Sequence, residues 1–235
     1  MKDKGVSDKR TAPDVKPVQP VGRRQWLLHC SLLACALPWQ AHAGAAEAAQ
    51  KPTLLVLGDS LSAEYGLARG SGWVALLGER LAKAPRPWQV VNGSISGDTT
   101  AGGRSRLPAL LKQHRPKVVI IELGGNDALR GLPLASTRDN LDQMVTQAQA
   151  QGAKVLVAGM QVPPNYGAAY TRDFAAVFSD VARQHKAALV PFLLRGVADR
   201  PDADAWFQAD RIHPLAKAHP ILLDNVWPVL QPLLR

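Results

Sequence analysis

A regular alternation of short apolar runs with longer segments of helical spacing constrains the fold of this chain most strongly. Five apolar runs rich in branched residues have the length of buried strands: residues 53–57, 89–91, 118–123, 154–158 and 188–192. The intervening segments have the spacing of amphipathic helices: residues 73–84, 101–113, 137–151 and 169–185, with a proline-interrupted helix from Leu215 onward. Because crossovers between parallel strands are right-handed, this order predicts one α/β domain, a three-layer α/β/α sandwich around a mainly parallel five-stranded sheet.

Composition and charge narrow the possible partners. The chain has 235 residues, of which 46% are hydrophobic and 20% charged, as in soluble globular proteins. Residues 1–43 hold seven Lys or Arg and three Asp or Glu, so the formal charge of +9 falls to +5 for the 21 basic and 16 acidic residues that follow. No basic run interleaved with aromatic residues follows, so we expect no nucleic-acid partner.

The N-terminal segment has the order of a secretory leader. Arg23 and Arg24 precede an apolar run at residues 26–38, and Ala41-His42-Ala43 has the form of a cleavage site. We therefore expect a cleavable signal peptide at residues 1–43, a linker at 44–52, a hydrolase domain at 53–235, and a periplasmic or secreted protein without stable membrane insertion. The paired arginines leave twin-arginine export open beside the ordinary route, and Cys35 leaves a lipoprotein anchor open.

Cysteine usage is consistent with export. Cys30 and Cys35 both lie in the leader, so the cleaved protein has no cysteine and needs no disulfide in an oxidising compartment. A thiol nucleophile and a zinc–cysteine site are excluded by the same count.

Polar and glycine-rich motifs follow the first three expected strands. They are Gly58-Asp59-Ser60, Ser96-Gly97-Asp98 and Gly124-Gly125-Asn126-Asp127. Because the carboxyl ends of parallel strands share one edge of the sheet, where ligands bind in open α/β folds, we expect these motifs to cluster there.

Ser60, Asp210 and His213 are the candidate reactive residues. Ser60 is expected at a strand-to-helix turn, where it could serve only as a helix N-cap. Asp210 and His213, three residues apart, could orient an imidazole as a base, although a surface pair of this spacing is common. The chain order Ser, Asp, His near the C-terminus of an α/β sequence nevertheless favours a serine hydrolase, and the absence of G-x-S-x-G around Ser60 indicates a lineage other than the α/β-hydrolases.

Six blocks resemble the SGNH, or GDSL, hydrolase family. They are LLVLGDSLSAEYGL at 54–67, VVNGSISGDTT at 90–100, RLPALLKQH at 106–114, ELGGNDALRG at 122–131, PPNYG at 163–167 and DRIHP at 210–214. The resemblance implies a flavodoxin-like fold, with Ser60 as nucleophile, Asp210 and His213 as orienter and base, and Ser60, Gly97 and Asn126 as oxyanion-hole donors. It also implies small-molecule acyl substrates: thioesters, aryl esters and lysophospholipids. We expect a monomer that requires no cofactor.

Residues beside these motifs receive structural or substrate roles. The resemblance places Leu61 and Val162 at an apolar crevice for the acyl chain. We expect Asp59, Asp98 and Asp127 to be loop-bonding or capping carboxylates.

The other histidines receive no catalytic or metal-binding role. His114 and His185 have no nearby ligand set, so no metal site is expected. His219 is a weaker rival to His213 because it lacks an Asp three residues before it.

Three residues depart from the family pattern. Glu64 stands where glycine is expected, Arg211 stands where a small residue is usual, and Val162 replaces a leucine.

The sequence therefore predicts a secreted serine hydrolase that cleaves carboxylic esters and thioesters through an acyl-enzyme on Ser60. Two alternatives stay open at this level. One is a carbohydrate O-deacetylase with the same catalytic residues in a shallower, more polar cleft. The other is an inactive lipid- or glycan-binding protein of the same fold.

Overall fold

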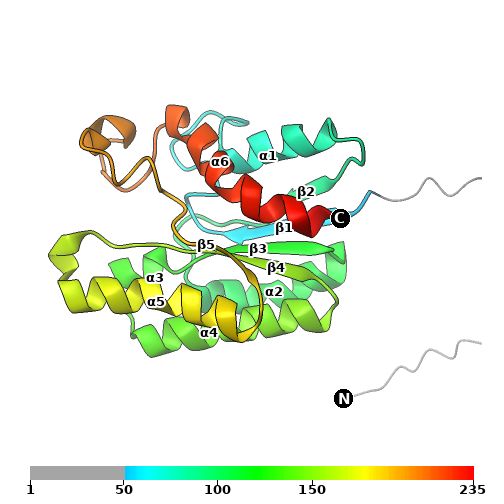
Figure 1. Ribbon diagram of the computed structural model, residues 1–235, viewed down its shortest axis with the longest axis horizontal. Helices are drawn as coiled ribbons and strands as arrows, with labels where there is room; N and C mark the ends of the chain where they lie inside the picture. Colours follow the sequence, from blue (N-terminus) through cyan, green and yellow to red (C-terminus); the bar gives the residue numbers. More distant parts are fainter. Residues whose placement is uncertain (1–50) are drawn as a thin grey trace, which may run out of the picture. The chain divides into compact units, whose positions relative to one another are not determined.

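The central sheet has the predicted five parallel strands. The structure is a computed structural model that describes residues 51–235. The strands are β1 (Thr53–Gly58), β2 (Gln89–Asn92), β3 (Val118–Glu122), β4 (Lys154–Ala158) and β5 (Ala188–Val190), in the order β2-β1-β3-β4-β5 (Figure 1). All neighbouring strands pair in parallel. The predicted signal peptide, Cys35 and most of the linker lie outside the described residues.

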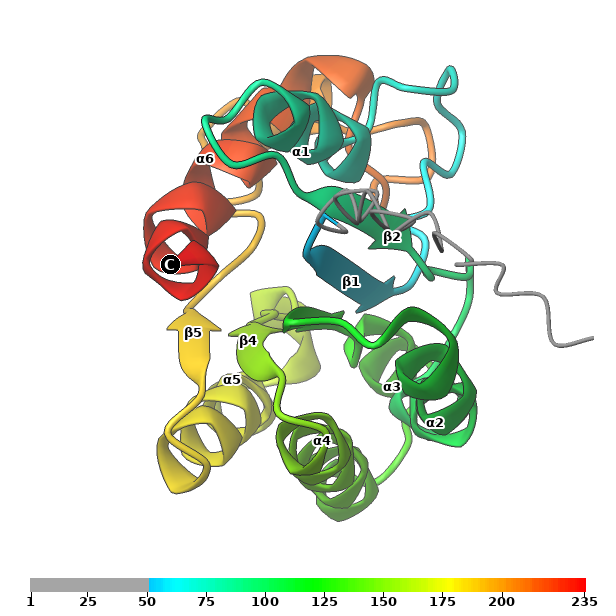
Figure 2. The ribbon, with the colours of Figure 1, turned by 90° about the vertical axis from the view of Figure 1, so that its right-hand side faces the viewer.

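Helices cover both faces of the sheet, which confirms the three-layer prediction. The helices are α1 (Trp73–Ala82), α2 (Thr100–His114), α3 (Gly125–Leu129), α4 (Leu134–Ala150), α5 (Ala168–Gln184) and α6 (His219–Leu230). Figure 2 shows α1 and α6 on one face and α2, α4 and α5 on the other. Among residues 51–235, none of the helices has the length and apolar character needed to cross a bilayer.

The core lies where the two central strands are covered from both sides. Leu54 through Leu57 of β1 and Val118 through Ile121 of β3 are fully buried. These near-continuous apolar runs are typical of a parallel strand with helices on both faces, where no alternating polar face is exposed. Burying each of these side chains contributes about 1.5–3 kcal/mol to folding.

One helix start was predicted at the right residue and one was not. The chain after Ser60 forms a series of turns over residues 60–66, and α1 begins at Trp73, the predicted start of this helix. Glu64 and Gly66 have φ values of 59° and 70°, in the left-handed region, so the backbone cannot continue as a right-handed helix. The helix expected from residue 137 begins at Leu134, because Pro133 at its N-cap presets the chain direction.

The strand order brings the first three polar motifs together. β1 lies between β2 and β3, so the loops that follow these three strands leave the same edge of the sheet side by side. The connection from β1 to β2 runs through α1 on one face of the sheet, and the connection from β2 to β3 runs through α2 on the other face. In α/β folds, such a change of face opens a crevice beyond the carboxyl ends of the strands.

Candidate active site

The hydroxyl of Ser60 and the ring of His213 meet at this edge. Ser60 follows β1 in the first turn, and His213 lies 153 residues later in the loop before α6. The Nε2 atom of His213 lies 2.8 Å from the Ser60 Oγ atom, within hydrogen-bonding distance. A base in this position can take the hydroxyl proton during nucleophilic attack.

Asp210 orients the ring of His213. Its Oδ2 atom lies 2.7 Å from His213 Nδ1, and its Oδ1 atom accepts the backbone N–H groups of Ile212, at 2.9 Å, and His213, at 3.0 Å. Burial raises the pKa of Asp210, but the hydrogen bonds from His213 and Ile212 outweigh this effect and lower the pKa to about 2. A carboxylate held in this way selects the ring tautomer that leaves Nε2 free to accept a proton.

A short hairpin-like loop holds Asp210 and His213. An antiparallel bridge pairs Phe207 with Pro214, and the Gln208 N–H donates to the His213 carbonyl at 2.8 Å. Arg211 has a φ of 59°, and its side chain reaches Asp204 at 3.6 Å, facing solvent. The positive φ explains why a small residue is usual here, and the Arg211 side chain is 76% exposed.

Gly97 and Asn126 lie in the loops after β2 and β3. Gly97 has a φ of 79°, and its carbonyl accepts a hydrogen bond from Arg130 at 2.7 Å. Asn126 lies in α3 and donates from Nδ2 to Asp59 Oδ2 at 3.1 Å. Backbone and side-chain amides fixed in this way can stabilise an oxyanion.

A family model decides the classification. The model of the GDSL-like lipase/acylhydrolase family matches residues 56–221. The chain belongs to this family. It is therefore a serine ester hydrolase, and the resemblance of the six sequence blocks is confirmed.

Named relatives and solved structures agree with the family. The chain is 56% identical over 182 residues to Esterase TesA of Pseudomonas aeruginosa, covering 77% of this chain and 89% of the relative. It is 43% identical over 190 residues to Thioesterase 1/protease 1/lysophospholipase L1 of Escherichia coli, with 79% and 86% covered. A crystal structure of TesA superimposes with a TM-score of 0.74 at 55% identity, covering 77% of this chain and 99% of that one.

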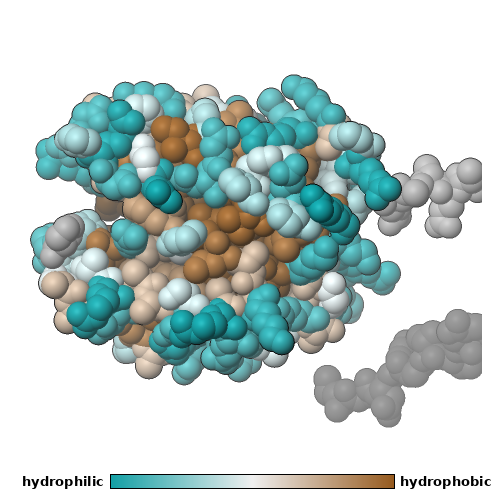
Figure 3. All heavy atoms as spheres, in the orientation of Figure 1, coloured by the Kyte–Doolittle hydropathy of each residue, from teal (hydrophilic) through white to brown (hydrophobic). Residues whose placement is uncertain are grey.

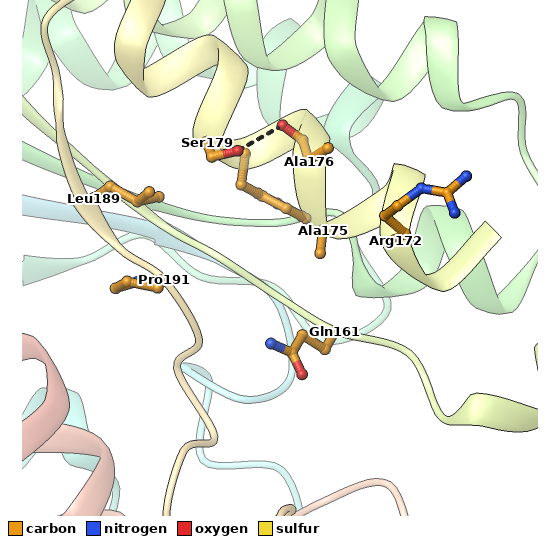
Figure 4. Close-up of a pocket in the computed structure, with 8 residues that line it drawn as sticks. Gln161, Arg172, Ala175, Ala176, Ser179, Leu189 and Pro191 are labelled. Carbon is orange, nitrogen blue, oxygen red and sulfur yellow. Dashed lines mark hydrogen bonds between the residues drawn. The ribbon is translucent and has the colours of Figure 1, made fainter. Parts of the chain in front are cut away.

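The predicted acyl-contact residues are largely buried. Leu61 is 6% exposed and Val162 is 8% exposed, and both belong to the hydrophobic core. A pocket of about 310 Å³ lies between α5 and the segment at β5, lined by side chains that include Gln161, Arg172, Leu189 and Pro191 (Figure 4). Figure 3 shows the apolar band along this side of the sheet. None of the predicted site residues lines this pocket, so the roles of Leu61 and Val162 stay predictions.

The remaining histidines serve other contacts. His219 is 2% exposed, its Nδ1 accepts the backbone N–H of Trp73 at 3.0 Å, and burial lowers its pKa. His219 thus accepts the N–H of the first residue of α1, whereas the ring beside the Ser60 hydroxyl is that of His213. His185 pairs with Asp142 at 2.6 Å between α5 and α4. Within the described residues, no cluster of His, Cys, Asp and Glu is arranged to hold a metal ion.

Sequence reasoning missed Tyr65 and Glu122. The ring of Tyr65 packs on His213 with centroids 4.3 Å apart and remains 49% exposed. Glu122 is fully buried directly behind the Ser60 turn. A carboxyl group inside an otherwise apolar strand was the signal for Glu122, whereas nothing local marks Tyr65.

Proposed function

We propose that this esterase cleaves acyl esters and thioesters in two steps through an acyl-enzyme on Ser60. The observation that carries the proposal is the continuous contact from Asp210 through His213 to Ser60, at 2.7 and 2.8 Å. The Ala63 N–H donates to the Asp59 carbonyl at 2.9 Å and closes the turn that presents Ser60, whose hydroxyl faces the His213 ring.

Each side chain has a role in the proposed cycle. His213 takes the Ser60 proton as Oγ attacks the carbonyl carbon, and Asp210 stabilises the imidazolium. The backbone N–H groups of Ser60 and Gly97 and the Asn126 amide hold the oxyanion. His213 then protonates the departing alcohol or thiol, and a water molecule activated by the same ring releases the acid from Ser60.

Acyl thioesters, aryl esters and lysophospholipids are the proposed substrates. Two relatives support this range: the Thioesterase 1/protease 1/lysophospholipase L1 of Escherichia coli and an Arylesterase of Vibrio mimicus, 42% identical over 182 residues. One active site can serve all three substrate classes, because each presents an acyl carbonyl to the serine. Leu61 and Val162 are the proposed acyl-chain contacts.

We also propose that residues 1–43 are a cleavable leader that directs export of residues 44–235. The exported protein is a monomer whose hydrolase domain spans residues 53–235. Mass spectrometry of the exported protein tests this, because cleavage after Ala43 and acylation of Cys35 give different N-terminal masses. Acylated Cys35 would replace the periplasmic or secreted protein with an anchored lipoprotein.

The deciding experiment is a panel of p-nitrophenyl esters from acetyl to palmitoyl, assayed on wild type, Ser60→Ala and the exposed control Ser136→Ala. We expect Ser60→Ala to lose at least about 10³-fold in kcat and Ser136→Ala to retain wild-type activity. Stoichiometric labelling of the wild type by a fluorophosphonate, absent in Ser60→Ala, identifies the nucleophile.

Two results would overturn the proposal. Much faster hydrolysis of acetylated sugars than of octanoyl or longer esters would make the protein a carbohydrate O-deacetylase. Lipid binding without fluorophosphonate labelling or thiol release from acyl thioesters would make it an inactive carrier.

A further inference from the structure

Two carboxyl side chains that the proposed mechanism does not use are buried behind the Ser60 turn. Asp59 is 2% exposed and Glu122 is fully buried. They are brought together by the register of the sheet, in which Gly58 at the end of β1 pairs with Glu122 at the end of β3. Ionisable groups are rarely placed in an apolar interior without specific hydrogen-bond partners.

Glu122 anchors the turn from the inner side. Its Oε2 atom accepts the Ser62 hydroxyl at 2.7 Å and the backbone N–H of Asp59 at 3.3 Å. The Ser62 oxygen in turn accepts the indole N–H of Trp73 at 3.2 Å. A Cβ atom on Gly58 would lie only 2.7 Å from Glu122 Oε2, so this approach requires glycine.

Asp59 connects the turn to Asn126. Its Oδ1 atom accepts the backbone N–H of Leu61, and its Oδ2 atom accepts the Nδ2 group of Asn126, both at 3.1 Å. An ionised carboxylate can only accept hydrogen bonds, so it selects the amide orientation in which Nδ2 faces Asp59. The second N–H of the same nitrogen is then left for the substrate oxyanion.

We propose that Asp59 is a positioning residue of the oxyanion hole, whose carboxylate orients the Asn126 amide while Glu122 holds the Asp59 backbone in place. This inference rests on the proposed function, in which Asn126 binds the oxyanion. It assigns roles to the Asp of the Gly-Asp-Ser motif and to the last residue of β3, neither of which touches the substrate.

The protonation states support this division. Burial raises the pKa of Asp59 to about 6, an effect opposed by the Leu61 and Asn126 hydrogen bonds and the His213 charge and increased by Asp98. Burial and the neighbouring Asp59 charge raise the pKa of Glu122 well above its usual range. Arg106 pairs with Asp98 at 2.7 Å and reaches the Gly58 carbonyl at 3.4 Å, so its charge is directed to those groups.

The negative charge of the pair therefore lies on Asp59 near neutral pH. Below about pH 6, Asp59 takes up a proton and can donate to the Asn126 Oδ1 atom. The amide then turns, and Nδ2 leaves the oxyanion position. The orientation of one oxyanion donor thus depends on the ionisation of a group that touches no substrate.

A double-mutant cycle tests the inference with Asp59→Asn, Asn126→Ala and the combined variant. In Asp59→Asn the side-chain oxygen must accept the Leu61 N–H, so the amide NH₂ faces Asn126 and favours its reversed orientation. We expect kcat to fall about 10²-fold for each single variant, with KM little changed, and no further fall in the combined variant. Asp224→Asn, which alters an exposed carboxylate on α6, is the matched control and retains wild-type kcat.

The pH profile of kcat gives a second readout that needs no Asp59 variant. His213 must be unprotonated to act as the base, so both the wild type and Asn126→Ala lose kcat at acidic pH. We expect the wild-type profile to contain one further ionisation, near pH 6, that Asn126→Ala lacks, because the amide that Asp59 orients has been removed. For Glu122, Glu122→Gln keeps an acceptor for Ser62 and the Asp59 N–H, so it should recover most of the kcat that Glu122→Leu loses.

The outcomes separate the inference from the proposed function. If Asn126→Ala slows kcat but Asp59→Asn does not, or if Asp59→Asn costs as much in the Asn126→Ala background as in the wild type, Asp59 does not act through Asn126. If Asn126→Ala has wild-type kcat, Asn126 is not an oxyanion donor and both assignments fail. Should Asp59→Asn not fold, pH profiles with the same number of ionisations in the wild type and in Asn126→Ala overturn the inference.

Discussion

At the scale of single residues, the base of the proposed triad has a neighbour that the mechanism does not require. Tyr65 lies five residues after Ser60, and its ring packs against His213 at 4.3 Å with an interplanar angle of 38°. Gln208 holds this contact, because its side chain donates to the Tyr65 carbonyl at 2.9 Å while its backbone N–H donates to His213. An aromatic face next to an imidazole stabilises the ring when it becomes positively charged.

Replacing Tyr65 tests this contribution. We expect Tyr65→Ala to lower kcat about 2- to 5-fold, because a partly exposed cation–π contact contributes about 0.5–1 kcal/mol to the charged state formed during attack. Tyr65→Phe keeps the aromatic face and should retain nearly full kcat. Steady-state kinetics with one p-nitrophenyl ester measures both, and equal losses in the two variants would assign the effect to the phenol hydroxyl.

At the scale of elements, the turns between β1 and α1 depend on a residue that departs from the family pattern. Glu64 has a φ of 59°, a conformation that favours glycine. Its carboxylate accepts the backbone N–H groups of Gly70, at 3.0 Å, and Gly72, at 2.7 Å. A Cβ on Gly72 would lie 2.6 Å from the Glu64 side chain, so the two positions are matched. Side-chain hydrogen bonds thus compensate for a strained backbone.

Two substitutions separate these opposing effects. Glu64→Ala loses the hydrogen bonds and keeps the strain, so we expect it to lower the free energy of unfolding by about 1–2 kcal/mol. Glu64→Gly loses the same hydrogen bonds but removes the strain, and should be about 1 kcal/mol more stable than Glu64→Ala. Urea unfolding followed by circular dichroism measures the difference, and a Glu64→Gly variant less stable than Glu64→Ala would contradict this account.

At the scale of the whole molecule, the buried carboxyl pair links stability to pH. The folded-state pKa values of Asp59 and Glu122 are raised, so each group binds its proton more tightly in the folded state than in the unfolded chain. Their effect on stability is absent at acidic pH, where both states are protonated. It becomes unfavourable as pH rises through the unfolded values of 3.8 and 4.5, at which the unfolded chain ionises first.

Glu122→Gln removes one of these ionisations. We expect the variant to gain stability over the wild type as pH rises above about 4.5, by up to about 1.4 kcal/mol per pH unit until the folded-state pKa is reached. Below pH 4 the difference should no longer change with pH. Urea unfolding from pH 3 to 8 gives the curve, and a stability difference independent of pH would show that Glu122 is ionised in the folded state.

Much of the fold follows from local patterns in the sequence. The apolar runs predicted all five strands within a few residues, because a parallel strand covered on both faces must be apolar along its length. The turn after Ser60 was harder, since Glu64 adopts a left-handed conformation that only its distant hydrogen bonds make acceptable. The short helix α3 was missed because five residues carry too little periodicity to be recognised.

The sequence by itself determined the layers, the family, and the local pairing of Asp210 with His213, since backbone periodicity and a three-residue spacing act over short distances. Only the tertiary structure decided that Ser60 and His213 lie 2.8 Å apart, that Asp59 contacts Asn126, and that Glu122 is enclosed between β1 and the Ser60 turn. These contacts join residues 60 to 153 positions apart, and their geometry depends on strand order and on the packing of loops at one edge of the sheet.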